Sequence, residues 1–303
     1  MRIRFLTASL LLLAVAARAD FREFKELPVD PAIETNLRHV AAETLKEFPK
    51  LKDEDLAISI VDVTRDSTIS RGAYHGDAPF YPASVVKLFI MAEVFHQRLE
   101  TQPDVPRALH EMIAVSDNDA TAFLIDTISD TCSGPSLSGR ALVKFIEKRR
   151  VTNKWFATMG YDISAMAKPW SFGPFGRDMQ VLGENRINRN RATSNAVASL
   201  MLWIVRGRAV SKPASDQMMA LLARPLDPPR AEENQVKEFI GASVPAGSKL
   251  WSKAGWTSEV RHDAAYVELP SGRKLVVVIF TRGIADDVTL VPAVARHVFE
   301  EMK

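Results

Sequence analysis

The first third of the chain combines one long amphipathic segment with shorter apolar runs. Apolar residues recur at helical spacing between residues 31 and 48 and define one face, made of Ile33, Leu37, Val40, Ala41, Leu45 and Phe48. This spacing predicts an amphipathic helix. Residues 56–63 are rich in Ile and Val and predict a strand, with which residues 68–74 can pair across a turn. Residues 84–99 are apolar almost all round, which is typical of a helix buried inside a domain.

The rest of the chain favours helices first and strands afterwards. Residues 105–240 predict short helices separated by loops, and the longest predicted loop covers residues 168–191. Residues 248–258, 262–269 and 274–281 predict an antiparallel meander, and residues 288–302 predict a closing amphipathic helix. No repeat and no regular strand–helix alternation is visible. The pattern predicts an α+β fold, in which an antiparallel sheet is built from both chain ends, flanked by terminal helices, and interrupted by an inserted helical lobe.

Residues 1–19 stand apart from this pattern. Arg2 and Arg4 precede an apolar run, and Ala17-Arg18-Ala19 fits the rule for cleavage before Asp20, so this segment is predicted to be a secretory signal peptide. The apolar run is shorter than the roughly 20 residues that span a bilayer. We therefore expect an exported protein, periplasmic or extracellular, without stable membrane insertion after cleavage. Residues 20–303 are predicted to form one domain, with residues 20–80 and 245–303 in an α/β lobe and residues 81–244 in a helical lobe.

Composition argues against several classes of function. Lys plus Arg number 39 and Asp plus Glu number 37, and loss of the three arginines in the signal peptide leaves no charge excess that would favour nucleic acid. The six histidines lack the usual zinc-binding spacings, so neither a metal nor another cofactor is expected. Cys132 is the only cysteine, which excludes an internal disulfide, and its loop-like surroundings favour an incidental thiol over a catalytic one. We expect a monomer that acts on a small molecule.

Ser84 and Lys87 form a Ser-x-x-Lys motif at the start of the predicted buried helix. Residues three apart share a helix face, so Lys87 lies one turn from the Ser84 hydroxyl. A serine becomes a nucleophile when a base takes its proton, and burial lowers the pKa of a lysine toward the range that this task needs. A helix-capping serine beside a lysine that extends to solvent would give the same pattern. Residues 271–274 repeat it in a predicted hairpin tip, so the motif is weak by itself.

Two further motifs follow in the chain. Ser116-Asp117-Asn118 falls between two predicted helices, where the segment would also suit an N-cap for the helix that follows. Lys253-Ala254-Gly255 lies in a predicted strand, where an edge lysine beside a bulge glycine is the simpler explanation. The three motifs in this order, on a helix start, a loop and a strand, are far more specific than any one of them.

With these motifs the chain resembles the class A serine β-lactamases and their penicillin-binding relatives, whose motifs are Ser-x-x-Lys, Ser-Asp-Asn and Lys-Thr-Gly. The resemblance runs from about residue 31 to the C-terminus. It implies that Ser84 attacks a carbonyl carbon to form an acyl-enzyme and that Lys87 is the general base or part of its proton network. Ser116 would pass a proton to the leaving nitrogen, and Asn118 would hold Lys87 and the substrate side chain.

The resemblance also assigns roles to the strand motif. Lys253 would supply a positive field to the substrate carboxylate and lower the pKa of Lys87. The backbone N–H groups of Ser84 and Trp256 would form an oxyanion hole, in which each donor is worth roughly 10²–10³ in rate. Gly255 is expected beside the substrate as part of the same strand. Ala254 departs from the family pattern, because it lacks the hydroxyl that contacts the substrate carboxylate.

Thr257 or Arg261 is expected to compensate for Ala254, since an arginine can point an anion-binding fork at the substrate. A solvated arginine in a strand turn is an equal alternative for Arg261. A second departure is that the segment between Ser84 and Ser116 is shorter than in the class A pattern, which predicts a remodelled helical lobe.

Class A enzymes hydrolyse the acyl-enzyme with a water held by a loop glutamate, four residues before an asparagine. Glu184 and Asn188 fit that Glu-x-x-x-Asn form, and a solvated loop glutamate is the alternative. Three functions therefore stay open: a β-lactamase, a D,D-peptidase or related cell-envelope amidase or esterase that uses Ser84 and Lys87, and a non-catalytic envelope protein that binds a partner through residues 170–175. The first is the prediction that we favour.

Overall fold

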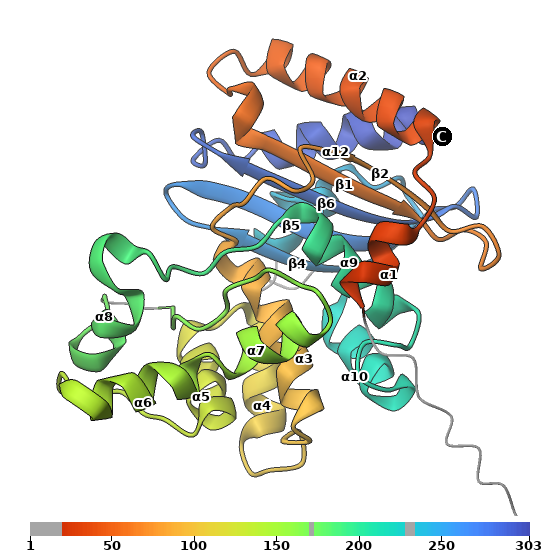
Figure 1. Ribbon diagram of the computed structural model, residues 1–303. Helices are drawn as coiled ribbons and strands as arrows, with labels where there is room; N and C mark the ends of the chain where they lie inside the picture. Colours follow the sequence, from red (N-terminus) through yellow and green to blue (C-terminus); the bar gives the residue numbers. More distant parts are fainter. Residues whose placement is uncertain (1–19, 170–172, 228–233) are drawn as a thin grey trace, which may run out of the picture.

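Strands from both ends of the chain meet in one antiparallel sheet. The computed structural model (Figure 1) describes residues 20–169, 173–227 and 234–303, so the predicted signal peptide lies outside the described residues. The strands are β1 (Leu56–Asp62), β2 (Ser70–Tyr74), β3 (Ala223–Arg224), β4 (Lys249–Trp256), β5 (Val260–Glu268) and β6 (Lys274–Arg282), in the order β2-β1-β6-β5-β4-β3. Because β1 pairs with β6, the two chain ends share the sheet, and the predicted α+β fold is confirmed.

Alternating side chains divide the apolar core into two layers. On one face the sheet packs against α2 (Pro31–Glu47) and α12 (Leu290–Glu301), and on the other against α9 (Ser194–Val205), behind which α3 (Lys87–His96) continues the same apolar layer. Figure 1 shows α2 and α12 on one side of the sheet and the helical lobe on the other. Leu250 and Ala254 of β4 face α2 and α12, while Trp251 packs on the opposite side. Since side chains alternate along a strand, Lys253 and Gly255 face the helical lobe.

The helical lobe is assembled from short helices. Besides α3 and α9 the chain forms α1 (Phe21–Glu26), α4 (Val105–His110), α5 (Asn118–Ser129), α6 (Gly139–Arg149), α7 (Val151–Thr158), α8 (Gly176–Leu182), α10 (Lys212–Leu222) and α11 (Asn234–Lys237). Short 3-10 turns are η1 (Asp53–Asp55), η2 (Ala83–Val86), η4 (Glu184–Arg186) and η6 (Ile240–Ser243), and η3 (Glu111–Val115) is a π-helical turn. None of the described helices is long and apolar enough to cross a membrane.

Two local predictions were wrong. The predicted loop 168–191 contains α8 and η4. Helix α8 buries only Asp178, Val181 and Leu182, so its apolar spacing is too sparse to stand out between flanking Gly and Pro residues. Strand β3 lies within the stretch predicted to be helical, because its two residues join the sheet through pairing with β4 and carry no strand pattern of their own.

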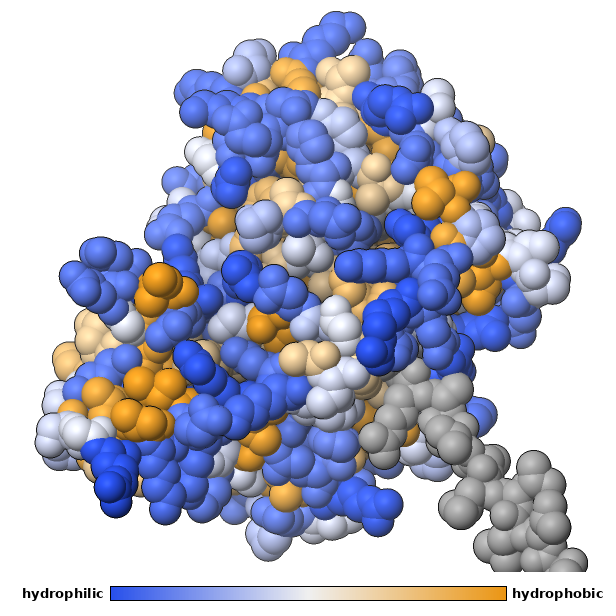
Figure 2. All heavy atoms as spheres, viewed as in Figure 1, coloured by the Kyte–Doolittle hydropathy of each residue, from blue (hydrophilic) through white to orange (hydrophobic). Residues whose placement is uncertain are grey.

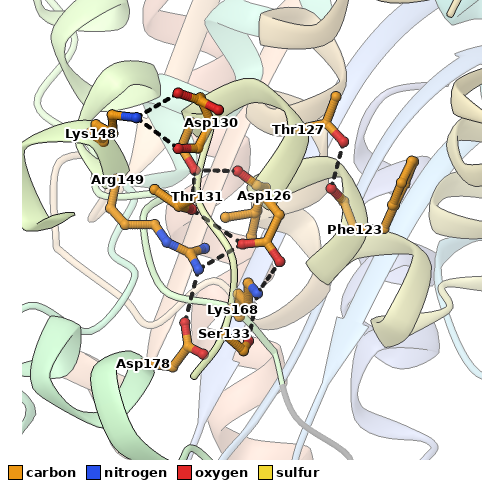
Figure 3. Close-up of polar contacts among 12 residues, drawn as sticks. Phe123, Asp126, Thr127, Asp130, Thr131, Ser133, Lys148, Arg149, Lys168 and Asp178 are labelled. Atoms are coloured by element: carbon orange, nitrogen blue, oxygen red, sulfur yellow. Dashed lines mark hydrogen bonds and ion pairs between the residues drawn. The ribbon is translucent and has the colours of Figure 1, made fainter. Parts of the chain in front are cut away.

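A buried charge cluster joins the helices of the lobe (Figure 3). Arg149 of α6 has no exposed side-chain surface and donates to Asp126 of α5 at 2.8 Å and to Asp178 of α8 at 2.9 Å. Lys168 donates to the other oxygen of Asp126 at 2.5 Å and to Ser133 at 2.8 Å. Two cations thus face two carboxylates, and their attraction offsets the cost of removing all four charges from water.

Replacing Arg149 by methionine is expected to lower the free energy of unfolding by about 3 kcal/mol or more, because Asp178 would keep a buried charge without its partner. Urea unfolding of the purified protein measures this change. The neighbouring Arg150 is exposed, and Arg150→Met is expected to change stability by less than about 0.5 kcal/mol. Equal effects of the two substitutions would contradict the account.

Candidate active site

Ser84 lies in a tight turn rather than inside the buried helix. The turn η2 covers Ala83–Val86, and α3 begins only at Lys87. Ala83 has a φ of 45°, in the left-handed region that residues with a side chain rarely adopt and that collects at functional sites. Val85 and Val86 are buried on the apolar side, while Ser84 stays partly exposed. The turn therefore presents the Ser84 hydroxyl while its neighbours anchor the backbone.

Strand β4 approaches this turn so closely that only glycine fits at position 255. A Cβ atom on Gly255 would lie 2.8 Å from the backbone nitrogens of Ser84 and Val85. Thr257 N donates to Val260 O at 2.9 Å, so Thr257 is in a hydrogen-bonded pair with β5. In an antiparallel ladder the adjacent residue, here Trp256, directs its N–H away from the partner strand. The Trp256 N–H therefore points to the open edge of β4, beside the turn that holds Ser84, as an oxyanion hole requires.

Lys87 is surrounded by oxygens of the Ser116 segment. Its Nζ donates to Ser116 O at 2.7 Å, to Asn118 Oδ1 at 3.0 Å and to Ser116 Oγ at 3.2 Å. Burial lowers the pKa of Lys87 to about 7, and the nearby Asp117 opposes this shift. Among the described residues no hydrogen bond joins Lys87 to the Ser84 side chain, so proton transfer between them needs a side-chain rotation or a bridging water.

Ser116 owes its position to an unusual stretch of backbone. The π-helical turn η3 ends immediately before it, and Ser116 itself has a φ of 67°. Turns of this kind recur at functional sites, where the surrounding structure holds them in place. Asp117, rather than Ser116, caps α5 through a 2.6 Å bond from Ala120 N. The Ser116 hydroxyl is therefore left to the two lysines.

Lys253 reaches the same hydroxyl from the sheet. Its Nζ is fully buried and donates to Ser116 Oγ at 3.0 Å, to Gln235 Oε1 at 2.5 Å and to Ala254 O at 2.7 Å. Burial lowers the pKa of Lys253, and the positive charges of Lys87 and Arg224 lower it further. The structure thus brings the three sequence motifs together, with Ser116 Oγ between the two amines.

Two residues that the sequence motifs do not include fix this arrangement. Gln235 donates to Ala114 O at 2.5 Å while it accepts from Lys253. Arg224 donates to Ile113 O at 2.6 Å and to Ala114 O at 3.2 Å. Both side chains are buried, and together they bind carbonyls of the π-helical turn. Neither residue lies in a recognisable motif, so only the folded chain reveals them.

Replacing Gln235 by leucine is expected to slow acylation of Ser84 by about tenfold to hundredfold, since an unsatisfied buried polar group costs roughly 1–3 kcal/mol. The measurement is kcat/KM of Gln235→Leu and of wild type for a chromogenic substrate. The control is Gln217→Leu on the exposed surface of α10. Gln235→Glu keeps an acceptor for Lys253 and should recover part of the rate. Unchanged kcat/KM together with a lower melting temperature would assign Gln235 a purely structural role.

The loop with Glu184 and Asn188 borders the site at one end. Glu184 is exposed, and Asn188 donates to Val181 O at 3.0 Å. Arg189 stacks over the ring of Tyr81, with 3.6 Å between its guanidinium carbon and the ring centre, and it pairs with Glu259 at 2.6 Å. Because Tyr81 is three residues before Ser84, the end of this loop is anchored beside the nucleophile. The Glu184 carboxylate makes no hydrogen bond or ion pair within the described residues, while its backbone carbonyl accepts from Ile187 N at 3.2 Å.

Arg261 lies opposite Trp256 on β5. Its guanidinium donates to Ala285 O at 2.9 Å and to Glu238 at 3.2 Å, and only 7% of its side chain is exposed. A substrate carboxylate would therefore have to compete with Glu238 for this cation. The hydroxyl of Thr257 accepts from Glu259 N at 3.1 Å within the turn between β4 and β5. The roles predicted for Arg261 and Thr257 stay predictions.

A part of the chain that contains two of the three motifs matches a known protein family. The model of the beta-lactamase enzyme family (Beta-lactamase2) matches residues 96–302, a span that includes Ser116 and Lys253 and begins after Ser84. No curated protein matches the chain.

Solved structures share the fold. PBP-A matches with a TM-score of 0.63 and 19% identity over 91% of this chain and 98% of that chain. A class A beta-lactamase from Mycobacterium abscessus matches with a TM-score of 0.62 and 16% identity over 86% and 97%. A beta-lactamase from Sphaerobacter thermophilus matches with a TM-score of 0.59 and 20% identity over 86% and 95%. Because the family model covers more than half of the residues, the chain belongs to the beta-lactamase enzyme family.

Proposed function

We propose that this protein is an exported serine hydrolase that opens the β-lactam amide through an acyl-enzyme on Ser84. The observation that carries the proposal is the Ser116 hydroxyl, held by Lys87 Nζ at 3.2 Å and by Lys253 Nζ at 3.0 Å. A hydroxyl that accepts from two amines has its own proton directed elsewhere, toward a leaving nitrogen. Family membership supports the reaction class. The penicillin-G acyl-enzyme of a PBP-A mutant, 20% identical, supports the choice of β-lactam.

Acylation then follows from the arrangement of groups. Neutral Lys87 accepts the proton of Ser84 as its Oγ bonds to the carbonyl carbon of the β-lactam. The carbonyl oxygen takes the negative charge and accepts from the N–H groups of Ser84 and Trp256. When the carbon–nitrogen bond breaks, Ser116 gives its proton to the leaving nitrogen and recovers one from Lys87. The products of this step are the Ser84 ester and a free amine in the opened ring.

Deacylation requires a second base. In the proposal Asn188 orients a water, and Glu184 takes a proton from it as the water oxygen bonds to the carbonyl carbon of the Ser84 ester. The bond between that carbon and Ser84 Oγ then breaks, Oγ regains a proton, and the opened product leaves as a carboxylate. The position of their loop beside Tyr81 supports this role, because Arg189 fixes the end of the loop there. Glu184 is exposed and has to turn toward Ser84 for this step, which makes it the first residue to test.

The Glu184→Gln variant is expected to be acylated normally by a chromogenic cephalosporin but to release product about 10²–10⁴-fold more slowly, because the general base of deacylation is lost. Stopped-flow kinetics would record a burst of one equivalent followed by a slow steady state. Glu43→Gln on the surface of α2 is the control. Stoichiometric labelling of the wild type without turnover would reject the β-lactamase and favour the second candidate.

The second candidate is a D,D-peptidase or a related cell-envelope amidase or esterase. Two observations favour it: Ala254 lacks the hydroxyl of the family motif, and the exposed Glu184 carboxylate has no partner among the described residues. Release of D-alanine from a cell-wall pentapeptide, absent in Ser84→Ala, would support this function.

The third candidate, a non-catalytic binding protein, rested on residues 170–175, of which 170–172 lie outside the described residues. Covalent capture of a labelled penicillin at Ser84 would argue against it.

A further inference from the structure

Three large apolar side chains stand exposed at α8 and at its two ends: Phe175 precedes the helix, Met179 lies within it and Ile187 follows it. Phe175 and Met179 are one helical turn apart, and Gly183 continues that face. A Cβ atom on Gly183 would lie 3.0 Å from Ile187 Cγ2, so Ile187 covers the end of the same face. The exposed fractions are 73% for Phe175, 47% for Met179 and 82% for Ile187. We call these three residues the α8 stripe.

The stripe lies at the periphery of the helical lobe. Figure 1 places α8 at the left edge of the molecule, away from the sheet, and Figure 2 shows hydrophobic surface gathered over α8 and the chain beside it. Asp178, Val181 and Leu182 of α8 are buried and hold the helix against the lobe, while Met179 and Phe175 stay in solvent. Contiguous exposed apolar side chains of this size mark an interaction surface.

The chain around the stripe is strongly basic. Residues 139–191 contain eleven Lys or Arg against four Asp or Glu, whereas the other 250 residues contain 28 against 33. Arg149, Lys168 and Asp178 of this segment are buried in the cluster of Figure 3. Four of the other nine cations pair with acids: Lys148 with Asp130, Lys154 with Glu147, Arg189 with Glu259 and Arg191 with Asp162. Five cations have no ion pair among the described residues: Arg140, Lys144, Arg150, Arg177 and Arg186. Arg186 is exposed next to Ile187. Glu184 is an acid beside the stripe, and it does not reverse the excess of positive charge.

We propose that the α8 stripe and its basic surroundings dock onto an anionic lipid bilayer. A bilayer is the partner that combines both required chemistries, an anionic headgroup layer for the arginines and an apolar interior for Phe175 and Ile187. A soluble polyanion would use the cations and leave the apolar side chains in water. A protein partner would need an acidic surface with a matching apolar hollow. Side chains that protrude at the edge of the molecule fit insertion into a deformable layer better.

Docking in this way has a consequence for the position of the active site. The loop that carries Ile187 continues to Arg189, which stacks on Tyr81 beside Ser84. A bilayer bound at the stripe would hold the site close to the membrane surface. Binding itself does not depend on Ser84 chemistry, so its test is independent of the proposed function.

Co-sedimentation of the purified mature protein with vesicles tests the proposal. We expect binding to vesicles that contain phosphatidylglycerol, little binding to pure phosphatidylcholine vesicles, and weaker binding at high salt because the charge attraction is screened. The double variant Phe175→Ser/Ile187→Ser is expected to bind about tenfold more weakly or worse, since two large apolar side chains would no longer leave water on binding. Arg186→Glu should weaken binding as well.

The matched controls are Val29→Ser and Val288→Ser, which remove apolar side chains exposed by 44% and 41% elsewhere on the surface, and Lys46→Glu on α2. All three should bind as wild type does. Absence of binding to phosphatidylglycerol vesicles would overturn the proposal. If the double serine variant binds as tightly as wild type, charge attraction alone explains the binding, and this result would also overturn the proposal. A concentration-dependent oligomer that the double variant abolishes, without vesicle binding, would assign the stripe to a protein interface instead.

Discussion

Replacing Ser84 by alanine is expected to abolish turnover of β-lactams and covalent labelling by them, with a fall in kcat/KM on the order of 10⁴-fold or more. The Ser116 hydroxyl cannot replace it, because Ser116 Oγ is engaged by Lys87 and Lys253. The removed oxygen belongs to a partly exposed side chain in η2, so the fold should be retained. Kinetics with a chromogenic cephalosporin and circular dichroism measure the two effects.

The chain supplies a matched control in its second Ser-x-x-Lys sequence. Ser271 lies in the turn between β5 and β6 and is exposed, with no helix to place Lys274 beside its hydroxyl. Ser271→Ala is therefore expected to retain full activity. Comparable losses in the two alanine variants, or residual turnover in Ser84→Ala above about 1% of wild type, would contradict the assignment of the nucleophile.

The rate of acylation is expected to rise about tenfold per pH unit up to about pH 7 and to level off above it. Burial lowers the pKa of Lys87 to about 7, and a lysine accepts a proton only in its neutral form, which predominates above its pKa. An unshifted lysine would extend the rise to about pH 10. The measurement is kcat/KM against pH, which reports the groups of the free enzyme.

Substitutions of the two lysines identify which amine causes this rise. Lys87→Arg keeps a cation that does not lose its proton, so acylation should fall about 10²–10⁴-fold and lose its dependence on pH near 7. Lys253→Arg should lower the rate and retain the rise, because Lys87 is still present. A rise that disappears in Lys253→Arg and persists in Lys87→Arg would exchange the roles of the two residues.

Much of the site could be predicted because its parts are local. Ser84 and Lys87 are three residues apart, and a turn of helix is enough to place them together. Gly255 and Trp256 follow Lys253 on one strand. Because side chains along a strand point alternately to its two faces, the sequence shows which of these residues face the helical lobe. The sheet was predictable for the same reason, since β1 and β6 are rich in Ile and Val.

Other features depend on contacts between distant segments. Gln235 meets Ala114 across more than 100 residues, and no local pattern distinguishes it from any other glutamine. The π-helical turn before Ser116 arises because Arg224 and Gln235 bind its carbonyls, so its sequence alone predicts an ordinary helix end. Met179 of α8 and Phe175 immediately before the helix are exposed, which reverses the usual arrangement and hides the helix from a search for a buried apolar face.

The central claim is that Ser84 is acylated in a site whose leaving-group acid is a hydroxyl held by two lysines. Digestion and mass spectrometry of the protein trapped with penicillin test it most directly, with Ser84→Ala and Lys253→Met treated in parallel. The account predicts one penicilloyl group, located on the peptide that contains Ser84, absent from Ser84→Ala and formed far more slowly in Lys253→Met. An adduct on any other residue, or equal labelling of wild type and Lys253→Met, would contradict it.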